Sequence, residues 1–228
     1  GGAQQIVRVD WENIEKIKEN VENKIIEFIK KNIKNFDAVI LEDYGKGVIT
    51  PDIAASGVSQ AKLHKKIITI DPKDEHFDYY RGATAITPNR KETENAIRNI
   101  KIRNAYSNLR VSCDRLITDE DIDLAGKGLL DYLSLEAVLI TLGAKGMRLF
   151  ERDKKPHHID TVAQEVFDVS GAGDTVIAVF TLALISGATM PEAALIANFA
   201  AGIVVGKRGV ATTTQSQLLD IIRNFKRH

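Results

Sequence analysis

The chain has 228 residues, of which 44% are hydrophobic, so it can bury one core as a single globular domain and is neither disordered nor fibrous. Lys and Arg total 31, as do Asp and Glu, so no overall charge attracts the chain to nucleic acid or to an anionic membrane surface. The single cysteine, Cys113, excludes an internal disulfide framework and a thiolate metal cluster, and the cytoplasm is the expected location.

The hydrophobic pattern predicts that helices and strands alternate along the chain. Apolar residues recur at helical spacing from Trp11 to Ile33, which predicts a long amphipathic helix. The polar stretch from Lys91 to Leu116 predicts only a helix followed by a loop. The other expected elements, in chain order, are a strand at 38–41, a helix at 53–63, strands at 66–70 and 83–87, a helix at 122–133, a strand at 137–141, a hairpin of strands 147–151 and 158–161, and helices at 175–186, 191–205 and 216–225.

Strands that are apolar throughout must be covered on both faces, and the helices between them provide the crossovers that parallel pairing needs. The sequence therefore predicts an α/β protein with a mostly parallel sheet. In such a sheet the ligand lies beyond the carboxyl ends of the strands. Polar and glycine-rich loops follow four of the predicted strands, at 43–47, 71–73, 88–92 and 141–146.

The strongest functional signal is Asp168-Val169-Ser170-Gly171-Ala172-Gly173-Asp174-Thr175, which leads directly into an apolar helix. Small residues let a ligand approach the backbone, and the free amides of a helix's first turn attract an anion. A carboxylate at this place, Asp174, is suited to take a proton from an attacking hydroxyl beside a bound phosphate. The same pattern equally fits a glycine-rich turn in which Asp174 only caps the helix.

Two further motifs follow predicted strands. Thr141-Leu142-Gly143-Ala144-Lys145-Gly146 either places Thr141 and glycine backbone against nucleotide phosphates or, as glycines there more often do, simply turns the chain. Asn89 and Glu92 are three residues apart after Pro88, which puts both on one helix face. Their oxygens suit Mg²⁺ held through water, but the pair fits a helix cap as well.

Charged residues in the first two strand-end loops are ambiguous. Lys46 and Lys73 each follow a strand end, where an ammonium could neutralise a transferred phosphate. Most surface lysines are only solvated, so solvation is the favoured interpretation of each lysine alone. Asp43 fits two roles that the sequence does not separate, binding a sugar hydroxyl or capping its loop.

Together, Asn89-x-x-Glu92, Thr141-x-Gly143-x-x-Gly146 and Gly171-Ala172-Gly173-Asp174, in this order on an α/β frame, resemble the motifs of the ribokinase-like (PfkB-type) sugar kinases. The likeness runs from about Gln4 to Leu219 and weakens between Glu94 and Thr118. Five segments look more narrowly like the kinase part of the bacterial ADP-heptose synthesis enzymes: Leu41–Gly47, Ile70–Lys73, Tyr80–Thr84, Gln164–Val169 and Ala197–Lys207.

The resemblance implies a three-layer fold and transfer of the ATP γ-phosphate to the anomeric hydroxyl of D-glycero-D-manno-heptose 7-phosphate. The product would be the 1,7-bisphosphate used for the lipopolysaccharide inner core. The family's site residues, carried over by motif, are Asp174 as the base, the amides of Gly171, Ala172 and Gly173 as the anion hole, Asn89 and Glu92 around Mg²⁺ and phosphate, Thr141, Gly143 and Gly146 along the ATP site, Asn198 near the adenine, and Asp168 beside a monovalent cation such as K⁺.

The resemblance also implies that an N-terminal segment is missing. Such kinases begin with strands that carry a Gly-Gly-x-x-x-Asn sugar-binding motif and a small β-sheet lid, and roughly a third of the usual chain is absent before Gln4. Residues 1–228 are then a single kinase domain without those strands and the lid. A sheet shortened in this way exposes an edge and apolar helix faces, which favours a homo-oligomer such as a dimer.

The same gap leaves the function open in two ways. Because the segment that carries sugar specificity is not in the sequence, the chain could instead belong to a ribokinase-like kinase for another sugar or sugar phosphate. It could also be a nucleotide-binding module that has no turnover. Neither alternative involves nucleic acid or a membrane as a partner.

Overall fold

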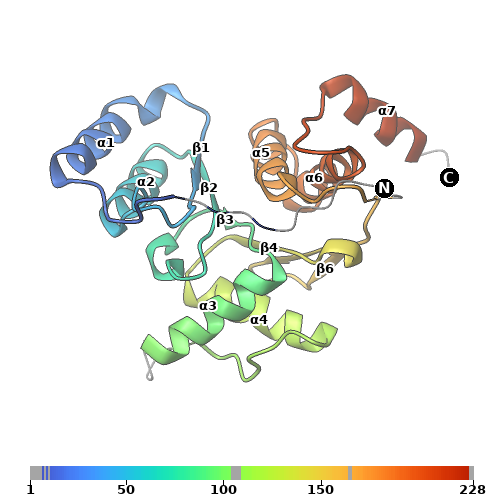
Figure 1. Ribbon diagram of the computed structural model, residues 1–228, viewed down its shortest axis with the longest axis horizontal. Helices are drawn as coiled ribbons and strands as arrows, with labels where there is room; N and C mark the ends of the chain where they lie inside the picture. The colour runs from blue at the N-terminus through green and yellow to red at the C-terminus, as the bar shows by residue number, and fades with distance from the viewer. Residues whose placement is uncertain (1–6, 8, 10, 104–108, 164–165, 226–228) are drawn as a thin grey trace.

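The computed structural model describes residues 7, 9, 11–103, 109–163 and 166–225, and it is an α/β structure built on one six-stranded sheet (Figure 1). The order of the strands in the sheet follows the sequence. The first four strands are parallel to one another, the fifth is antiparallel to the fourth, and the sixth is antiparallel to the fifth. The predicted mostly parallel sheet is therefore confirmed. The strands are β1 (Ala38–Glu42), β2 (Ile67–Asp71), β3 (Ala85–Ile86), β4 (Ala137–Thr141), β5 (Met147–Glu151) and β6 (His157–Ile159).

Seven α-helices and three short 3₁₀ turns are found in the described part of the chain. None of these helices combines the length and the apolar character that crossing a membrane requires. The α-helices are α1 (Glu19–Asn32), α2 (Pro51–Leu63), α3 (Arg90–Arg103), α4 (Asp119–Tyr132), α5 (Ala172–Ile185), α6 (Met190–Val205) and α7 (Gln215–Phe225), and the 3₁₀ turns are η1 (Ile33–Asn35), η2 (Phe77–Tyr80) and η3 (Gly143–Lys145).

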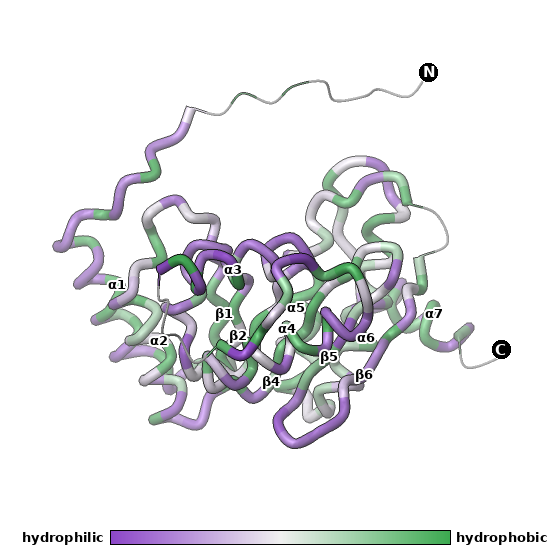
Figure 2. Tube along the Cα trace, turned by 90° about the horizontal axis from the view of Figure 1, so that it is seen from below, coloured by the Kyte–Doolittle hydropathy of each residue, from purple (hydrophilic) through white to green (hydrophobic). Residues whose placement is uncertain are grey.

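The helices cover both faces of the sheet, which gives three layers. Figure 1 shows α5 and α6 on one side of the sheet and α3 and α4 on the opposite side. Alternate side chains of a strand face opposite layers, so Ile68 and Ile70 of β2 join the core under α2, α3 and α4. Between them, the Thr69 hydroxyl lies 2.6 Å from that of Thr181 on α5. The apolar segments of the chain accordingly gather around the strands in Figure 2.

Several of the predicted elements differ from the structure at their ends. The helix expected from Trp11 begins only at Glu19, so the prediction is wrong for 11–18. An amphipathic helix is stabilised mainly by packing its apolar face, and Trp11 is 91% exposed. The strand expected at 83–87 is reduced to the two residues of β3, and the second hairpin strand, expected at 158–161, is His157–Ile159.

The polar stretch after Lys91 was predicted as helix plus loop, and α3 followed by a loop is what the structure contains. Residues 104–108 of that stretch lie outside the described residues, as do Gln164 and Glu165 at the start of one family-like segment. The helix predicted at 122–133 is present as α4. Thr118 and Asp121 cap it reciprocally.

Strand β1 forms one edge of the sheet in the described part of the chain. Ile40 in this strand is 37% exposed. On α1, the helix that packs on α2, the apolar side chains of Val21 and Phe28 are exposed as well. Among the described residues, β1 is thus an edge strand, and α1 carries exposed apolar side chains.

Candidate active site

The Gly171-Ala172-Gly173-Asp174 motif forms the first turn of α5. Gly171 is the N-cap residue, with φ +77°, a left-handed conformation that glycine adopts without strain. The first backbone bond within the turn runs from the Thr175 amide to the Gly171 carbonyl at 3.0 Å, so the amides before Thr175 have no acceptor in the helix. The Ala172 amide donates instead to the Val169 carbonyl at 3.2 Å. The Gly171 and Gly173 amides are therefore the better candidates to bind an anion.

Three carboxyl groups meet at this helix end. Glu42 and Asp71 are the last residues of β1 and β2 and pair in register, and Asp174 lies exposed at the third position of α5. One oxygen of each group lies within 4.8 Å of the others. Sequence reasoning did not name Glu42 or Asp71 as site residues. The available signal was that both end strands whose carboxyl ends share one edge of the sheet.

Two of the three acids in this cluster, Asp71 and Glu42, have raised pKa values. Burial and then the charge of Glu42 raise the pKa of Asp71 to about 8. The pKa of Glu42 is also raised, first by burial and then by the charge of Asp174. The Oε2 atom of Glu42 is buried without a hydrogen-bond partner among the described residues. Like charges this close in a partly buried place hold protons above their usual range.

Tyr44 is a third residue that sequence reasoning did not name as part of the site. Its hydroxyl donates a hydrogen bond to Oδ1 of Asp174 at 3.3 Å. The negative charge of Asp174 is the largest cause that raises the pKa of the Tyr44 phenol, followed by burial. The loop after β1 thus supplies a proton donor to the carboxylate at the start of α5.

Asn89 and Glu92 cap α3 reciprocally. The Glu92 amide donates to Oδ1 of Asn89 at 2.9 Å, and the Asn89 amide donates to Oε2 of Glu92 at 2.8 Å. The capping role is therefore real, but Oε1 of Glu92 receives no hydrogen bond from the described residues. Burial raises the pKa of Glu92, partly offset by the Asn89 amide. A bridge between Asn89 and Thr141 brings this cap beside the end of β4.

A cavity of about 500 Å³ brings most of the other predicted residues together. It lies between the turn after β4, the segments 161–163 and 166–169, the start of α5, and α6. Asn198 on α6 is buried, and its side-chain amide donates to the Asp160 carbonyl at 2.7 Å. The predicted site residues that line the cavity are Thr141, Gly143, Gly146, Ala172, Gly173 and Asn198.

The two glycines of the turn after β4 play different roles. Gly146 has φ +77°, and a Cβ atom there would lie 2.0 Å from the Ile159 carbonyl oxygen. Only glycine fits where the turn after β4 meets the backbone at Ile159. Gly143 also has a positive φ, +60°, but a Cβ atom there would meet nothing within 4 Å. Backbone at Gly143 is thus open to a ligand, whereas Gly146 lets the β5–β6 hairpin close against the turn.

The loops after β1 and β2 hold the two predicted lysines in ion pairs. Lys46 contacts Glu12, and the Lys73 ammonium lies 3.6 Å from Oδ1 of Asp74.

Asp43, for which the sequence left open a sugar hydroxyl or a loop cap, caps its loop. Its side chain is 1% exposed, and Oδ1 accepts the Gly45 amide at 2.8 Å. The buried carboxylate is out of reach of a sugar, so the sugar-binding alternative is wrong.

Asp168 precedes the glycine-rich turn. Its Oδ1 accepts the Ser170 amide at 2.9 Å, and this bond is the largest cause that lowers the pKa of Asp168. Its own amide donates to the Val205 carbonyl at the end of α6. The residue is half-buried, and its carboxylate lies in the segment that borders the cavity.

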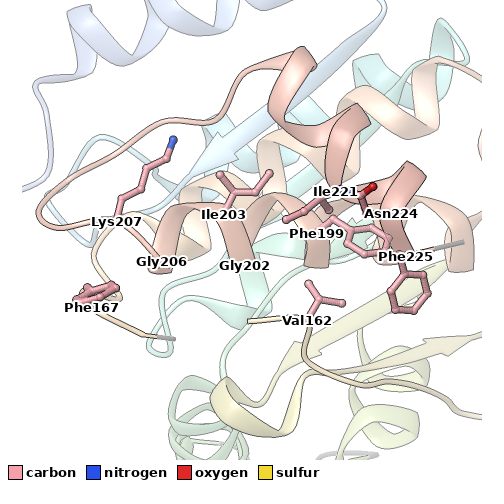
Figure 3. Close-up of a pocket in the computed structure, with 10 residues that line it drawn as sticks. All are labelled: Val162, Phe167, Phe199, Gly202, Ile203, Gly206, Lys207, Ile221, Asn224 and Phe225. Atoms are coloured by element: carbon pink, nitrogen blue, oxygen red, sulfur yellow. The ribbon is translucent and has the colours of Figure 1, made fainter. Parts of the chain in front are cut away.

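A second cavity, of about 650 Å³, lies between α6, α7 and the segment around Val162 (Figure 3). Figure 3 shows Phe199, Ile221 and Phe225 gathered at its α7 end. None of the predicted site residues lines this cavity. Gly202 lines both cavities, so they lie on either side of one stretch of α6.

The chain is similar to known proteins over nearly its whole length. Residues 2–217 match the family described as pfkB family carbohydrate kinase. The "Bifunctional protein HldE" of Geotalea uraniireducens is 40% identical over 216 residues, which is 95% of this chain and 41% of that protein. The protein of the same name in Geobacter metallireducens is 42% identical, with the same two coverages. The chain thus spans about two fifths of the length of these curated relatives.

Solved structures share the fold. Arabidopsis thaliana ribokinase, complexed with ribose and ATP, has a TM-score of 0.66 and 21% identity, covering 92% of this chain and 60% of that one. Phosphofructokinase-2 of Escherichia coli, in complex with potassium, has a TM-score of 0.71 and 16% identity, covering 93% and 64%. The chain therefore has the ribokinase-like fold. The chain belongs to the pfkB family of carbohydrate kinases, and the resemblance read from its motifs is confirmed.

Proposed function

We propose that the chain is the kinase domain of an enzyme that uses ATP to phosphorylate the anomeric hydroxyl of D-glycero-D-manno-heptose 7-phosphate. The observation that carries the proposal is the position of Asp174, at the start of a buried helix and next to the cavity lined by Thr141, Gly143 and Asn198. The segments that look like bacterial ADP-heptose synthesis enzymes favour this sugar over others. ADP-heptose and lipopolysaccharide biosynthesis would then be the pathway served.

In the proposed reaction Asp174 accepts the proton of the sugar hydroxyl. The hydroxyl oxygen forms a bond to the γ-phosphorus of ATP, and the bond from that phosphorus to the β,γ-bridging oxygen breaks, releasing ADP. Such a transfer needs little covalent help, so it depends on positioning and on stabilising charge at the phosphoryl oxygens. The first-turn amides of α5, chiefly those of Gly171 and Gly173, and the Lys73 ammonium would supply that charge. Lys46 would act similarly only after leaving Glu12.

ATP would occupy the 500 Å³ cavity. Thr141 and the open backbone of Gly143 would lie along its phosphates, and Gly146 would shape that turn. Asn198 would lie near the adenine. In this placement the adenine ring packs against the apolar walls of the cavity from α5 and α6. Val176, Ala201 and Val205 form these walls.

Mg²⁺ fits the donors at the start of α3. Oδ1 of Asn89 and the carboxylate of Glu92 are oxygen donors, and Oε1 of Glu92, which accepts no hydrogen bond from the described residues, could bind a water held by the ion. The ion would supply neutralisation of phosphate charge. A monovalent cation such as K⁺ would be held near Asp168, which is half-buried and whose pKa is lowered by the Ser170 amide. The protein's own contribution in both places is to orient the oxygen donors.

The proposal is tested by ADP release from the full-length protein with a panel of sugars. We expect release with D-glycero-D-manno-heptose 7-phosphate and little release with free hexoses, free pentoses or other sugar phosphates. Faster release with another sugar would show a ribokinase-like kinase of different specificity. If ATP with Mg²⁺ raises the melting temperature while no sugar yields ADP, the chain is a nucleotide-binding module instead.

A further inference from the structure

A buried hydrogen-bond network joins the loops that follow β1 and β2. The Tyr80 hydroxyl, fully buried at the end of η2, donates to Oδ2 of Asp43 at 2.6 Å and accepts the Lys73 amide at 2.9 Å. The same Oδ2 lies 2.8 Å from Nδ1 of His76. We infer that Tyr80, through the Asp43 carboxylate and the Lys73 amide, is a positioning residue that places the Lys73 ammonium for phosphoryl transfer.

The Lys73 side chain lies along the loop that Asp43 caps. Gly45 has φ +66°, and a Cβ atom there would lie 3.2 Å from both Cγ and Cε of Lys73. The stem of Lys73 therefore rests against Gly45, whose amide is bonded to Asp43. Asp43 thus fixes Gly45, against which the Lys73 side chain rests. Through Tyr80 it also fixes the backbone of Lys73.

Helix α3 holds the same loop from the other side. The Asn95 side-chain amide donates to Oδ2 of Asp74 at 2.7 Å, and that of Asn99 donates to the Asp74 carbonyl at 3.1 Å. Arg103 donates to the Glu75 carbonyl at 2.6 Å. Every residue from 73 to 76 is therefore bonded to another part of the molecule, which is unusual for a loop and leaves Lys73 little freedom.

The place of Lys73 in the fold agrees with this role. Lys73 is two residues after Asp71, one oxygen of which lies within 4.8 Å of an oxygen of Asp174, so the loop that carries the lysine borders the proposed phosphate site. Packing alone would not need the Tyr80 hydroxyl, because its buried neighbour Phe77 lacks one. A hydroxyl inside a core is unfavourable unless it is bonded, and here both of its bonds go to the two loops.

The inference rests on the proposed function, because it assumes that Lys73 contacts the transferred phosphate. In the full-length protein, Tyr80→Phe should lower kcat on the order of tenfold and leave the KM for ATP nearly unchanged, since the ring and the nucleotide cavity are kept. Tyr132→Phe is the matched control. Tyr132 donates to Asp78, at the middle of the same 3₁₀ turn and outside the network, so its loss should not change kcat.

A double-mutant cycle separates positioning from a merely structural role. Lys73→Met should lower kcat, and adding Tyr80→Phe should lower it no further if Tyr80 acts through Lys73. Independent, multiplying losses would overturn the inference, as would a Lys73→Met protein with unchanged kcat.

Hydrogen exchange gives a readout that does not depend on the sugar. The Lys73 amide should exchange faster in Tyr80→Phe than in the unchanged protein or in Tyr132→Phe, and equal rates would also overturn the inference. Failure of the proposed function appears differently, as the absence of ADP release from the unchanged protein with heptose 7-phosphate.

Discussion

Tyr44 and Asp174 are 130 residues apart in the sequence, yet the phenol of one donates a hydrogen bond to the carboxylate of the other at 3.3 Å. Two acids, Glu42 and Asp71, also lie near that carboxylate, with one oxygen of each within 4.8 Å of an Asp174 oxygen. Tyr44 is therefore the side chain that orients Asp174, whereas the neighbouring Asp71 has a pKa raised to about 8 and keeps its proton at neutral pH. A proton acceptor held in this way is suited to receive a proton from an alcohol.

Asp174→Asn should lower kcat by roughly 10²- to 10⁴-fold, the usual contribution of a general base. The dissociation constant of ATP should change little, because the substitution removes a proton acceptor and not a nucleotide contact. The asparagine oxygen can still accept the Tyr44 hydrogen bond, so the melting temperature should stay close to that of the unchanged protein. Equal losses in kcat and in ATP affinity would contradict the role of a base.

Glu92→Gln should change the dependence on Mg²⁺. The glutamine oxygen can keep the cap bond to the Asn89 amide, so the free energy of unfolding should change by less than about 1 kcal/mol. The loss of charge should raise the Mg²⁺ concentration for half-maximal turnover by about tenfold, as for other groups that act on a metal through water. Glu94→Gln on the same helix is the control. An Mg²⁺ titration identical in all three proteins would remove Glu92 from the metal site.

Asp71 should make the protein less stable as the pH rises. Its pKa is raised from 3.8 to about 8, so between these values the folded protein binds more protons than the unfolded chain. The free energy of unfolding therefore falls with pH in this window, by at most about 1.4 kcal/mol per pH unit from this group. Asp71→Asn should flatten the fall, measured by urea denaturation between about pH 5 and about pH 8.

A control for this pH series is Asp114→Asn. The hydrogen bond from Lys101 lowers the pKa of Asp114, so this group is already ionised across the window. The slope of the unchanged protein should persist in Asp114→Asn. If Asp71→Asn and Asp114→Asn show the same slope, Asp71 does not hold its proton in the folded protein.

Alanine at the two glycines after β4 should have unequal effects. Gly146→Ala places a methyl group where the Ile159 carbonyl lies and keeps a left-handed residue, so it should lower the free energy of unfolding by at least about 2 kcal/mol. Gly143→Ala has open space and should lose only about 1 kcal/mol for its conformation. Its larger effect should be on the KM for ATP. Similar losses of stability would show that the contact at Gly146 is unimportant.

The sequence predicts the elements well where a buried pattern decides them. The strands 38–41 and 137–141 and the helix at 191–205 correspond closely to β1, β4 and α6. It fails at 11–18, because the spacing of apolar residues does not show whether another surface is there to pack on them. Helical spacing describes one element, whereas the stability of a helix depends on its neighbours.

The site shows the same difference between features that are local in the sequence and features that depend on contacts between distant segments. Asp174 and its glycines stand out because their chemistry is local to one turn. The meeting of Glu42 with Asp71 depends on strand register, and the bond from Tyr44 depends on the position of α5 over β1, neither of which a sequence pattern contains. Asn89 and Glu92 were found by spacing, but spacing alone did not distinguish a helix cap from a metal site, and the structure shows that the cap is present.

Helix α5 is packed between the sheet and α6 and is pinned to β2 by the hydroxyls of Thr181 and Thr69. The dipoles at its amino end are therefore oriented during folding and need no reorganisation when a substrate arrives. The amino end of α5 is therefore a fixed part of the reaction site. Any closing movement during turnover has to come from the segments that face it.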